Sequence, residues 1–516
     1  MLDFIRKTVS DTLEGMGAKL TGKFDVMTAP EFTLCDYATN AAVKMAVKNK
    51  KKAADDLAGA LEKTGLFEEV KVLMPFVNMK LSMKSLVEHV NGEASVQSLP
   101  AVKEKILIEF VSANPTGPLH VGHLRGAVMG DALARILRFS GYEVITHYYV
   151  NDRGRQVQML AESILATKAG EPSPEGGYSG DWVNKIADEI SSGDDADKIK
   201  QIAVARILAG IKVTLDRLGI FFDVFYGEKK LYDDGIVEKT LEKLKEKKAV
   251  FEKDGAVWLD VSDRDDKDRV LYKKDGEPTY FLSDIAYHDE KFSEAEVCIN
   301  IWGADHHGYV ERLKSAVALL GRNSEKLEII LYQLVRLKRG AELLKMSKRD
   351  GTFLLADDVI DEVGADAVRY FLLSRKGDAQ LDFDLELAKE QSQKNPVYYL
   401  QYAHARICSI FEKAAGMGIK AASCGDLIGE ESRGIIKKIC EFTDKVELAS
   451  SERAPHHITS YLSELCALFH GYYDRSRVLD DAEPALSSQR LFLTGRVRET
   501  IRKGLELLGI SAPERM

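Results

Sequence analysis

The segment from Ile106 to Val150 constrains the fold of this chain more than any other. Ile106–Phe110 (ILIEF) is a short apolar run typical of a buried strand, and Ser112–Pro118 (SANPTGP) ends it with two prolines and a glycine. Apolar residues then recur at helical spacing from Val121, and Gly141 stands where such a helix would stop. Glu143–Val150 (EVITHYYV) has the pattern of a second strand. Strand, turn, helix and strand in this order predict one half of a doubly wound parallel sheet, which makes the chain an α/β protein.

An additional domain precedes this unit, since 516 residues are enough for several domains. Residues 1–95 mix helical with alternating patterns and predict a small α+β domain. The helical patterns cover Leu2–Leu13 and Asn40–Lys63, and the alternating ones cover Val70–Leu73 and Val77–Leu81. The polar stretch Asn91–Pro100 is then a linker to the next domain.

The sheet domain is expected to occupy residues 100–390. Further strand-like runs at Val297–Gly303 and Leu327–Leu337 supply its second half, and mainly helical material at about 155–275 predicts an insertion between the two halves. Residues 391–516 are almost wholly helical in pattern and predict an all-α bundle.

Composition limits the class of protein. The net charge of −9 provides no global positive field, although a local groove of Lys and Arg is sufficient to contact phosphates. The six cysteines include no CxxC pair, so neither a zinc ribbon nor a thioredoxin-type motif is expected, and no metal site is predicted. No apolar run approaches the ~20 residues that cross a bilayer, and the acidic N-terminal segment is unlike a signal peptide. We therefore expect a cytoplasmic protein that does not bind membranes.

The first candidate motif is His120-Val-Gly-His123, which stands where the turn becomes the helix. Two imidazoles three residues apart lie on one face of the first helical turn, whose free N–H groups and positive dipole end suit a phosphate. Gly122 has no side chain, so a flat adenine ring can approach the backbone there. Taken alone, the two histidines fit better as capping or surface residues.

The second candidate motif is Lys345-Met346-Ser347-Lys348-Arg349, followed by Asp350 and Gly351. Two ammonium groups on such a loop can close over a triphosphate and neutralise the departing pyrophosphate. Alone, the motif is also compatible with a basic surface loop. Other phosphate motifs of the GxxxxGK[ST] and GxGxxG types are absent from the sequence. The pair of motifs, more than two hundred residues apart, resembles the HIGH and KMSKS signatures of class I aminoacyl-tRNA synthetases.

Within that class, the sequence around the first motif is similar to that of arginyl-tRNA synthetases of the bacterial type. This segment is Glu109-Phe-Val-Ser-Ala-Asn114-Pro-Thr-Gly-Pro-Leu-His120. Further matching segments extend the resemblance over nearly the whole chain: Asp36–Asn40 (DYATN), Tyr280–Asp284 (YFLSD), Trp302–Gly308 (WGADHHG), Gly364–Arg369 (GADAVR) and Tyr399–Arg406 (YLQYAHAR). The sequence departs from the family signature at Arg349, which replaces the final Ser of KMSKS and whose role is open.

The resemblance implies a Rossmann-like catalytic domain, an N-terminal domain that contacts tRNA and a C-terminal bundle that reads the anticodon. It implies catalytic roles for His120, His123, Lys345 and Lys348. The ATP-binding residues would be Asn114, Pro115, Gly117, His120, Gly122, His123, Met346, Ser347 and Lys348, with Mg²⁺ carried by ATP and no dedicated protein site. The arginine-binding residues would be Glu109, Asn114, Tyr280, Asp284, Asp305 and His306, and the tRNA-binding residues Tyr398, Tyr402, His404 and Arg406.

Residue chemistry agrees with an arginine substrate. A guanidinium is planar and permanently charged, and it binds best to carboxylates and to aromatic faces. Glu109 ends a strand at the edge where such sheets bind ligands, and Tyr280 and Asp284 are four residues apart on a predicted helix. Without the resemblance, Tyr280 and Asp284 would fit better as a helix-start aromatic and an exposed acid.

The implied reaction has two steps: arginine and ATP form arginyl-adenylate and pyrophosphate, and the arginyl group then passes to the terminal adenosine of tRNA(Arg). The resemblance also implies that the first step needs bound tRNA, and we expect a monomer. Three alternatives remain at this point: a class I synthetase for glutamate or glutamine, a nucleotidylyltransferase with HxGH chemistry, and a non-catalytic tRNA-binding relative. The acidic Glu109 and Asp284 argue against the first, because they would repel a carboxylate.

Overall fold

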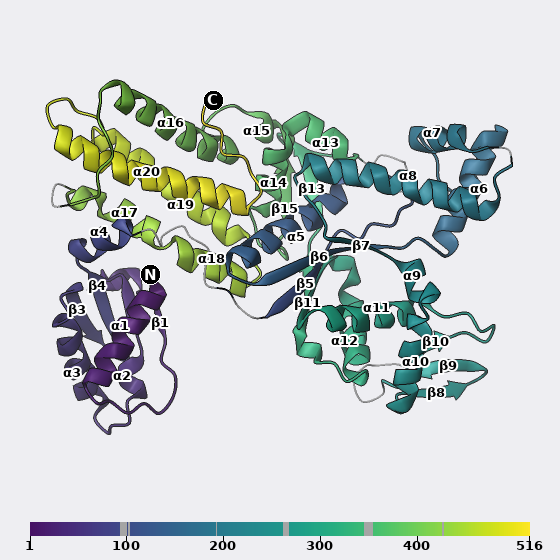
Figure 1. Cartoon of the computed structure of the whole chain (residues 1–516), viewed down its shortest axis with the longest axis horizontal. Coiled ribbons are helices and arrows are strands. Elements are labelled where there is room, and N and C mark those ends of the chain that lie inside the picture. Colours follow the sequence, from purple (N-terminus) through teal and green to yellow (C-terminus); the bar gives the residue numbers. More distant parts are fainter. Residues whose placement is uncertain (93–100, 102–103, 192, 262–267, 345–353, 426–427) are drawn as a thin grey trace.

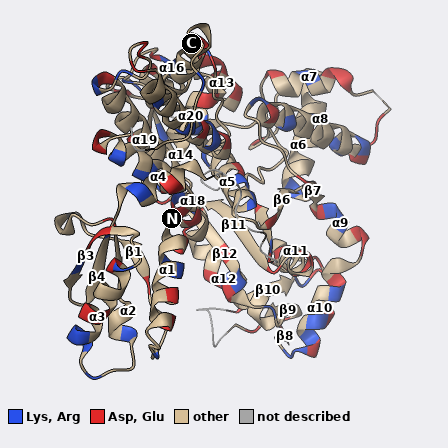
Figure 2. Cartoon of the chain, turned by 60° about the vertical axis from the view of Figure 1, so that its left-hand side comes forward, with Lys and Arg blue, Asp and Glu red and all other residues tan. Residues whose placement is uncertain are grey.

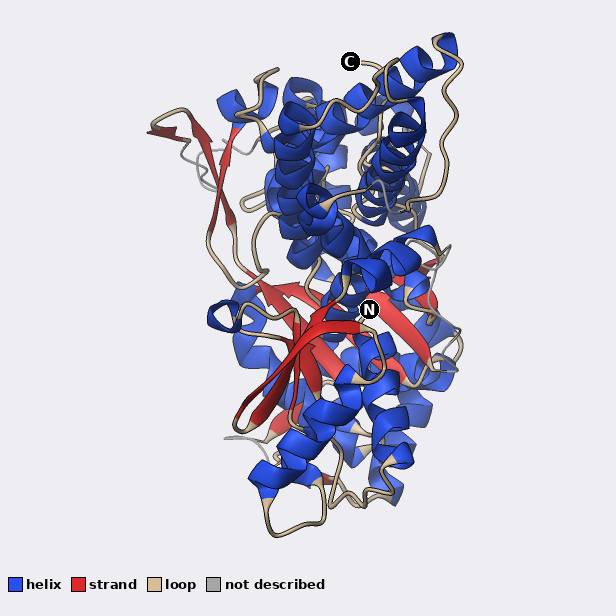
Figure 3. Cartoon of the chain, turned by 90° about the vertical axis from the view of Figure 1, so that its left-hand side faces the viewer, coloured by secondary structure: helices blue, strands red, loops and turns tan. Residues whose placement is uncertain are grey.

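The computed structural model describes residues 1–92, 101, 104–191, 193–261, 268–344, 354–425 and 428–516. The chain forms an N-terminal α+β unit, a central sheet with helices on its faces and a C-terminal group of long helices (Figure 1). Viewed from the side, helices gather at one end of the molecule, and most of the strands lie below them (Figure 3). In the described part of the chain, no helix is both long enough and apolar enough to cross a bilayer.

The N-terminal unit is a four-stranded antiparallel sheet packed on helices. Its strands, in the order β1-β2-β4-β3, are β1 (Val26–Thr28), β2 (Tyr37–Thr39), β3 (Phe67–Leu73) and β4 (Phe76–Leu81), and its helices are α1 (Leu2–Gly15), α2 (Ala41–Lys44), α3 (Lys50–Glu62) and α4 (Met83–Asn91). The prediction of one continuous helical segment over Asn40–Lys63 was wrong. The chain is extended at Met45, and α3 starts anew because the Asn49 side chain accepts a hydrogen bond from the Lys52 N–H (3.0 Å) and caps the helix.

The central sheet has five parallel strands in the order β12-β11-β5-β6-β7, which are β5 (Lys105–Glu109), β6 (Glu143–Val150), β7 (Val224–Gly227), β11 (Val297–Gly303) and β12 (Leu327–Tyr332). The predicted strand, turn, helix and strand are confirmed, with α5 (Val121–Phe139) as the crossover between β5 and β6. Strands β6 and β7 lie on one side of β5, and β11 and β12, which come later in the chain, lie on the other side. The strand order therefore reverses at β5, where doubly wound sheets bind their ligands.

The range 155–275, predicted as an insertion, is not an insertion throughout, because strand β7 lies within it and pairs with β6. Helices precede this strand, and a second lobe with the antiparallel sheet β10-β9-β8 follows it. The elements of this range are α6 (Arg155–Ala169), α7 (Asp181–Glu189), α8 (Ala196–Arg217), β7, α9 (Glu228–Asp233), α10 (Ile236–Glu246), β8 (Val250–Lys253), β9 (Ala256–Leu259) and β10 (Arg269–Tyr272).

Two connecting regions complete the central part. The first carries α11 (Tyr280–Glu294), the 3-10 turn η3 (Ala304–Tyr309) and α12 (Val310–Leu319) around β11. The second follows β12 and forms a small sheet in the order β14-β13-β15; its elements are β13 (Val335–Arg339), β14 (Glu342–Leu343), α13 (Ala356–Val363), α14 (Ala365–Leu373), β15 (Leu381–Asp384) and α15 (Leu385–Lys389). The predicted strand run Leu327–Leu337 is thus divided between two sheets.

Among its described residues, the C-terminal part contains helices and no strands, as predicted. Its helices are α16 (Pro396–Gly416), α17 (Arg433–Cys440), α18 (Phe442–Ser451), α19 (His456–Arg475) and α20 (Pro484–Leu507). Asn395 and Pro396 begin the first of these helices as cap and first residue, an arrangement that suits a helix start. This part also contacts the N-terminal unit, because Lys437 on α17 forms an ion pair with the buried Asp36 (2.9 Å).

Arg369 joins three parts of the molecule from a fully buried position on α14. Its guanidinium contacts the carboxylate of Asp131 on α5 and donates to the carbonyl oxygens of Leu218 after α8 (2.8 Å) and Leu508 after α20 (2.7 Å). Replacing this buried cation should lower the free energy of unfolding, because all of its hydrogen-bond acceptors lose their donor at once.

We expect Arg369→Met to lower the melting temperature by about 5–10 °C, because breaking a buried ion pair costs about 3–5 kcal/mol. Calorimetry would measure this. Arg206→Met is the matched control, because Arg206 is exposed and its ion pair with Glu189 should contribute little. Equal melting temperatures for the two variants would contradict the linking role of Arg369.

Candidate active site

A cavity of about 1210 Å³ opens at the carboxyl ends of β5 and β11. Clefts of this kind bind small molecules when a few polar groups converge in them, and this volume exceeds the range typical of one drug-sized ligand. Nine of the predicted substrate-binding residues line it: Glu109, Asn114, His120, Gly122, His123, Tyr280, Asp284, Asp305 and His306. Pro115 and Gly117 lie in the turn that leads to it and are not among its lining residues.

The turn after β5 places the two histidines at the start of α5. His120 is the N-cap residue, and its Nδ1 accepts a hydrogen bond from the Gly122 N–H (3.1 Å), while the Nδ1 of His123 accepts one from the His120 N–H (3.3 Å). The two rings stack with their centroids 3.8 Å apart. A neutral imidazole whose Nδ1 accepts a hydrogen bond carries its proton on Nε2. Each ring can therefore present an N–H donor at a helix N-terminus.

Gly122 is constrained to be glycine by its surroundings. A Cβ atom at this position would lie 2.9 Å from the Cε1 of His120, closer than side chains tolerate. The absence of a side chain therefore permits the His120 cap and leaves backbone facing the cavity.

Helix α11 presents Tyr280 and Asp284 to the same cavity, one turn apart. The hydroxyl of Tyr309 donates to the Asp284 carboxylate. Burial raises the pKa of Asp284 to about 6, the nearby charge of Glu109 adds to this rise, and the Tyr309 hydrogen bond and Lys291 oppose it. An aromatic ring and a partly desolvated carboxylate thus stand side by side, as a guanidinium site requires.

The resemblance implies arginine as the ligand at Asp284, and its binding there should depend on pH, because the carboxyl group is ionised above its pKa of about 6 and neutral below it. We expect the Kd for arginine to be constant near neutral pH and to rise as the pH falls through 6, approaching about tenfold per pH unit. Calorimetric titration of arginine at several pH values would measure this. A Kd that stays unchanged well below pH 6 would exclude Asp284 as the titrating group.

Glu109 is at the end of β5, as predicted, but both of its carboxylate oxygens already have partners within the protein. Lys291 on α11 contacts Oε2, and the Ser112 hydroxyl donates to Oε1 (2.9 Å). The sequence reasoning did not identify Lys291. Its spacing carried a signal, because 284, 288 and 291 recur at helical intervals and share one face of α11.

Asp305 and His306 lie in η3 at the exposed side of the cavity, with 3.8 Å between the His306 Nε2 and the Asp305 Oδ2. Asn114 is also exposed, and its amide donates to Gln156 (2.8 Å). Among the described residues, no three His, Cys, Asp or Glu side chains are arranged to hold a metal ion.

Lys345, Met346, Ser347, Lys348 and Arg349 of the second motif lie outside the described residues. The described chain on either side of them meets the cavity. Leu343 and Leu344 line it, and on the far side Leu354 accepts a hydrogen bond from the Val121 N–H (3.2 Å) while Leu355 forms a β-bridge with His120. Leu354 and Leu355 therefore lie at the HxGH turn, and Leu343 and Leu344 lie at the wall of the same cavity.

Three of the predicted tRNA-binding residues lie together on α16, remote from the cavity in sequence. The rings of Tyr398 and Tyr402 are 6.2 Å apart and nearly parallel, and the Arg406 guanidinium lies 4.2 Å from the centroid of Tyr473. His404 does not share this surface. It is buried, and its Nδ1–H donates to the Pro513 carbonyl oxygen (2.9 Å), so its prediction as a tRNA-stacking residue was wrong.

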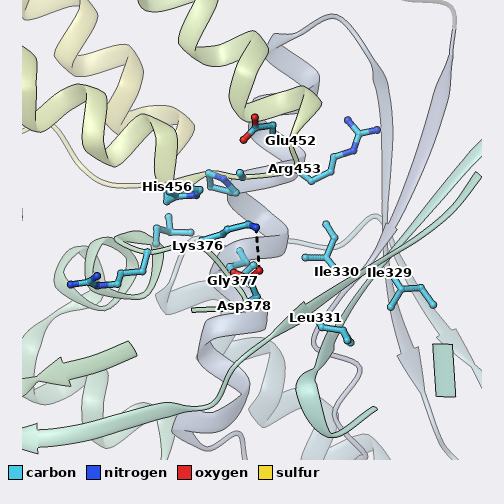
Figure 4. A pocket seen from close by; sticks show the side chains of 14 residues that line it. Ile329, Ile330, Leu331, Lys376, Gly377, Asp378, Glu452, Arg453 and His456 are labelled. Carbon is cyan, nitrogen blue, oxygen red and sulfur yellow. Dashed lines mark ion pairs between the residues drawn. The ribbon is translucent and has the colours of Figure 1, made fainter. Parts of the chain in front are cut away.

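A second cavity, of about 420 Å³, lies between β12 and the turn from α18 to α19 (Figure 4). Ile329, Ile330 and Leu331 form one side of it. Its charged residues include an ion pair between Lys376 and Asp378 (3.1 Å). None of the predicted site residues lines this cavity, so the chemistry is assigned to the larger one.

Comparison with known proteins agrees with this geometry. Three family models match consecutive parts of the chain: the arginyl-tRNA synthetase N-terminal domain (residues 3–81), the catalytic domain of class I tRNA synthetases of the arginine type (85–173 and 183–390) and the DALR anticodon-binding domain (400–516).

Individual relatives agree with the family models. The chain is 42% identical to an arginine–tRNA ligase of Nitratidesulfovibrio vulgaris over 98% of both chains, and 43% identical to one of Syntrophotalea carbinolica over 93% of both. The Thermus thermophilus arginyl-tRNA synthetase structure has the same fold, with a TM-score of 0.79, 23% identity and full coverage of both chains. The chain therefore belongs to the arginyl-tRNA synthetase family, the class I ligases that join arginine to tRNA.

Proposed function

We propose that this chain activates L-arginine with ATP and transfers the arginyl group to the 3′-terminal adenosine of tRNA(Arg), acting as a cytoplasmic monomer. The observation that supports this best is one cavity that contains both the HxGH turn and the carboxylates of Glu109 and Asp284. Glutamate would be repelled by these carboxylates, and a nucleotidylyltransferase has no need of the N-terminal unit and the C-terminal bundle.

In the first step, the arginine side chain lies between Tyr280 and Asp284, with Glu109 behind them and Asn114 near the α-amino group. The carboxylate of arginine attacks the α-phosphate of ATP in line, and pyrophosphate leaves. The Nε2–H groups of His120 and His123 donate to the phosphates at the α5 N-terminus, where developing negative charge is stabilised. Asp305 and His306 lie near the ribose.

ATP is assigned to the backbone of the HxGH turn, at Asn114 and Gly122, with Pro115 and Gly117 in the turn that leads to it and with Met346 and Ser347 of the second motif. Lys345 and Lys348 neutralise the departing pyrophosphate, and Arg349 adds a further positive charge. Mg²⁺ would be carried by ATP, without a dedicated protein site, and the carboxylates of Glu109 and Asp284 are assigned to arginine. Bound with ATP, it would supply positive charge that offsets the negative charge of the phosphates.

Transfer RNA contacts the protein beyond the cavity. Tyr398, Tyr402 and Arg406 offer the anticodon bases aromatic and cationic faces on which splayed bases stack. The N-terminal unit contacts the elbow of the tRNA. The outer helices mix both signs of charge, for example on α10 (Figure 2), so local groups rather than the net field bind the phosphates.

Arginine-dependent exchange of pyrophosphate into ATP tests this function, with glutamate, glutamine and lysine as controls and with tRNA present or omitted. We expect exchange only with arginine and only when tRNA(Arg) is present. Exchange with arginine alone would remove the tRNA requirement and keep the substrate. A lack of exchange with arginine under either condition would contradict the proposal.

A further inference from the structure

Lys291 lies fully buried below the cavity that we assign to arginine. Its ammonium contacts the Oε2 of Glu109, donates to the Oδ1 of Asn300 (2.8 Å) and lies 4.4 Å from the ring centroid of Tyr287. An ammonium removed from water is very costly unless its hydrogen bonds and its charge are satisfied. These contacts satisfy both, so the positive charge is a fixed part of the pocket floor.

The neighbouring His288 is neutral. Its Nδ1–H donates to the Asp284 carbonyl oxygen (2.7 Å), and its Nε2 accepts from the Asn300 amide (2.8 Å). Burial and the charge of Lys291 hold the pKa of His288 well below its usual value. His288 and Asn300 thus fix the position of Lys291 without adding charge.

Three charged groups of the protein therefore surround the position proposed for the arginine side chain. Glu109 and Asp284 each carry a negative charge when ionised, and Lys291 carries a positive one, which leaves one negative charge to match one guanidinium. Other titratable groups face this cluster from the elements packed around it: His147 and Tyr149 on β6, Tyr226 on β7, Glu228 on α9, Tyr287 and Glu294 on α11, and Tyr309 at the end of η3.

We propose that Lys291 is a positioning residue that keeps Glu109 ionised in one orientation, so that the pocket accepts a cationic guanidinium and rejects its neutral urea isostere. This inference rests on the arginine pocket of the proposed function. Lys291 does not touch the substrate. It acts through Glu109, since a buried carboxylate that loses its cation takes up a proton at neutral pH. A protonated Glu109 would donate to a urea oxygen and would no longer favour arginine.

The test is calorimetric titration of the full-length chain with arginine and with citrulline, the urea isostere of arginine. Each titration is made between pH 6.5 and 8.5 in two buffers of different ionisation enthalpy, which gives the number of protons released on binding. The variants are Lys291→Met, Lys291→Arg and Lys243→Met. Lys243 on α10 is the matched control. It forms an ion pair with Asp289, which is on the same helix as Lys291, but Lys243 is half exposed and lies outside the cavity.

For Lys291→Met we expect the Kd for arginine to rise at least tenfold at pH 7 and to fall again as the pH increases, because a buried carboxylate without a cation is more easily protonated. About one additional proton should be released on binding, and the preference for arginine over citrulline should fall at least tenfold. Lys291→Arg should restore the pH profile and the proton count, and Lys243→Met should match the wild type.

A Lys291→Met protein whose Kd, pH profile and proton count equal those of Lys243→Met would overturn the inference while leaving the proposed function intact. If the wild type binds no arginine, the proposed function fails, and the inference fails with it. Should Lys291→Met not fold, the double variant Glu109→Gln with Lys291→Met removes both buried charges. It should bind arginine with no proton release and a Kd independent of pH above 7, and a pH-dependent Kd there would overturn the role of Glu109 as the titrating group.

Discussion

Replacing Asp284 with asparagine is expected to raise the KM for arginine about a hundredfold to a thousandfold, because truncating one partner of a buried charge pair costs about 2–5 kcal/mol. The substitution keeps the size of the side chain and its hydrogen bond from Tyr309 but removes the charge that the guanidinium needs. The KM for ATP should change little, since the HxGH turn is on another element. Steady-state pyrophosphate exchange, measured with tRNA present, gives both constants.

The matched control for this prediction is Glu290→Gln, which makes the same chemical change farther along α11, outside the cavity. Its KM for arginine should equal that of the wild type. If Asp284→Asn also leaves the KM for arginine unchanged, the guanidinium does not bind at Asp284. The arginine pocket would then need another location.

The part of the fold that follows from local signals was predictable from the sequence. The run Ile106–Phe110, the Pro- and Gly-rich turn and the helix from Val121 each carry their own periodicity and caps, and the structure contains β5, the turn and α5 at nearly the same residues. Tyr280 and Asp284 also share a cavity, because a separation of four residues on a helix fixes their common face.

The wrong predictions concern residues whose pairing or burial depends on segments that are distant in the sequence. Strand β7 has only four residues and follows a long helical region, so its pairing with β6 leaves little trace in the sequence around it. His404 belongs to an amphipathic helix, but it is buried because the chain end at Pro513 covers it. The contact between Glu109 and Lys291 joins residues 182 positions apart, and only the packing of α11 beside β5 creates it.

The site could be predicted only as a set of residue types. The motifs indicate a helix N-terminus with two histidines, and the structure adds which nitrogen of each ring accepts from the backbone. Each Nδ1 accepts from the backbone, so the Nε2–H of each ring can act on a phosphate oxygen while His120 also caps the helix. Helix capping and phosphate binding by His120 therefore use different ring nitrogens, and a substitution can separate them.

The substitution His120→Asn separates these two roles. Asparagine is among the best N-cap residues, so it can accept from the Gly122 N–H and preserve the start of α5, but its shorter side chain has no donor at the position of Nε2. We expect the melting temperature to stay close to that of the wild type, and arginine- and tRNA-dependent pyrophosphate exchange to fall about 10²–10³-fold, the usual loss for one donor to a transition-state oxygen. His120→Ala, which lacks both cap and donor, should lose the same activity and also about 1 kcal/mol of stability. Full activity in His120→Asn would mean that His120 only caps the helix, and the phosphates would then be bound by His123 and the backbone alone.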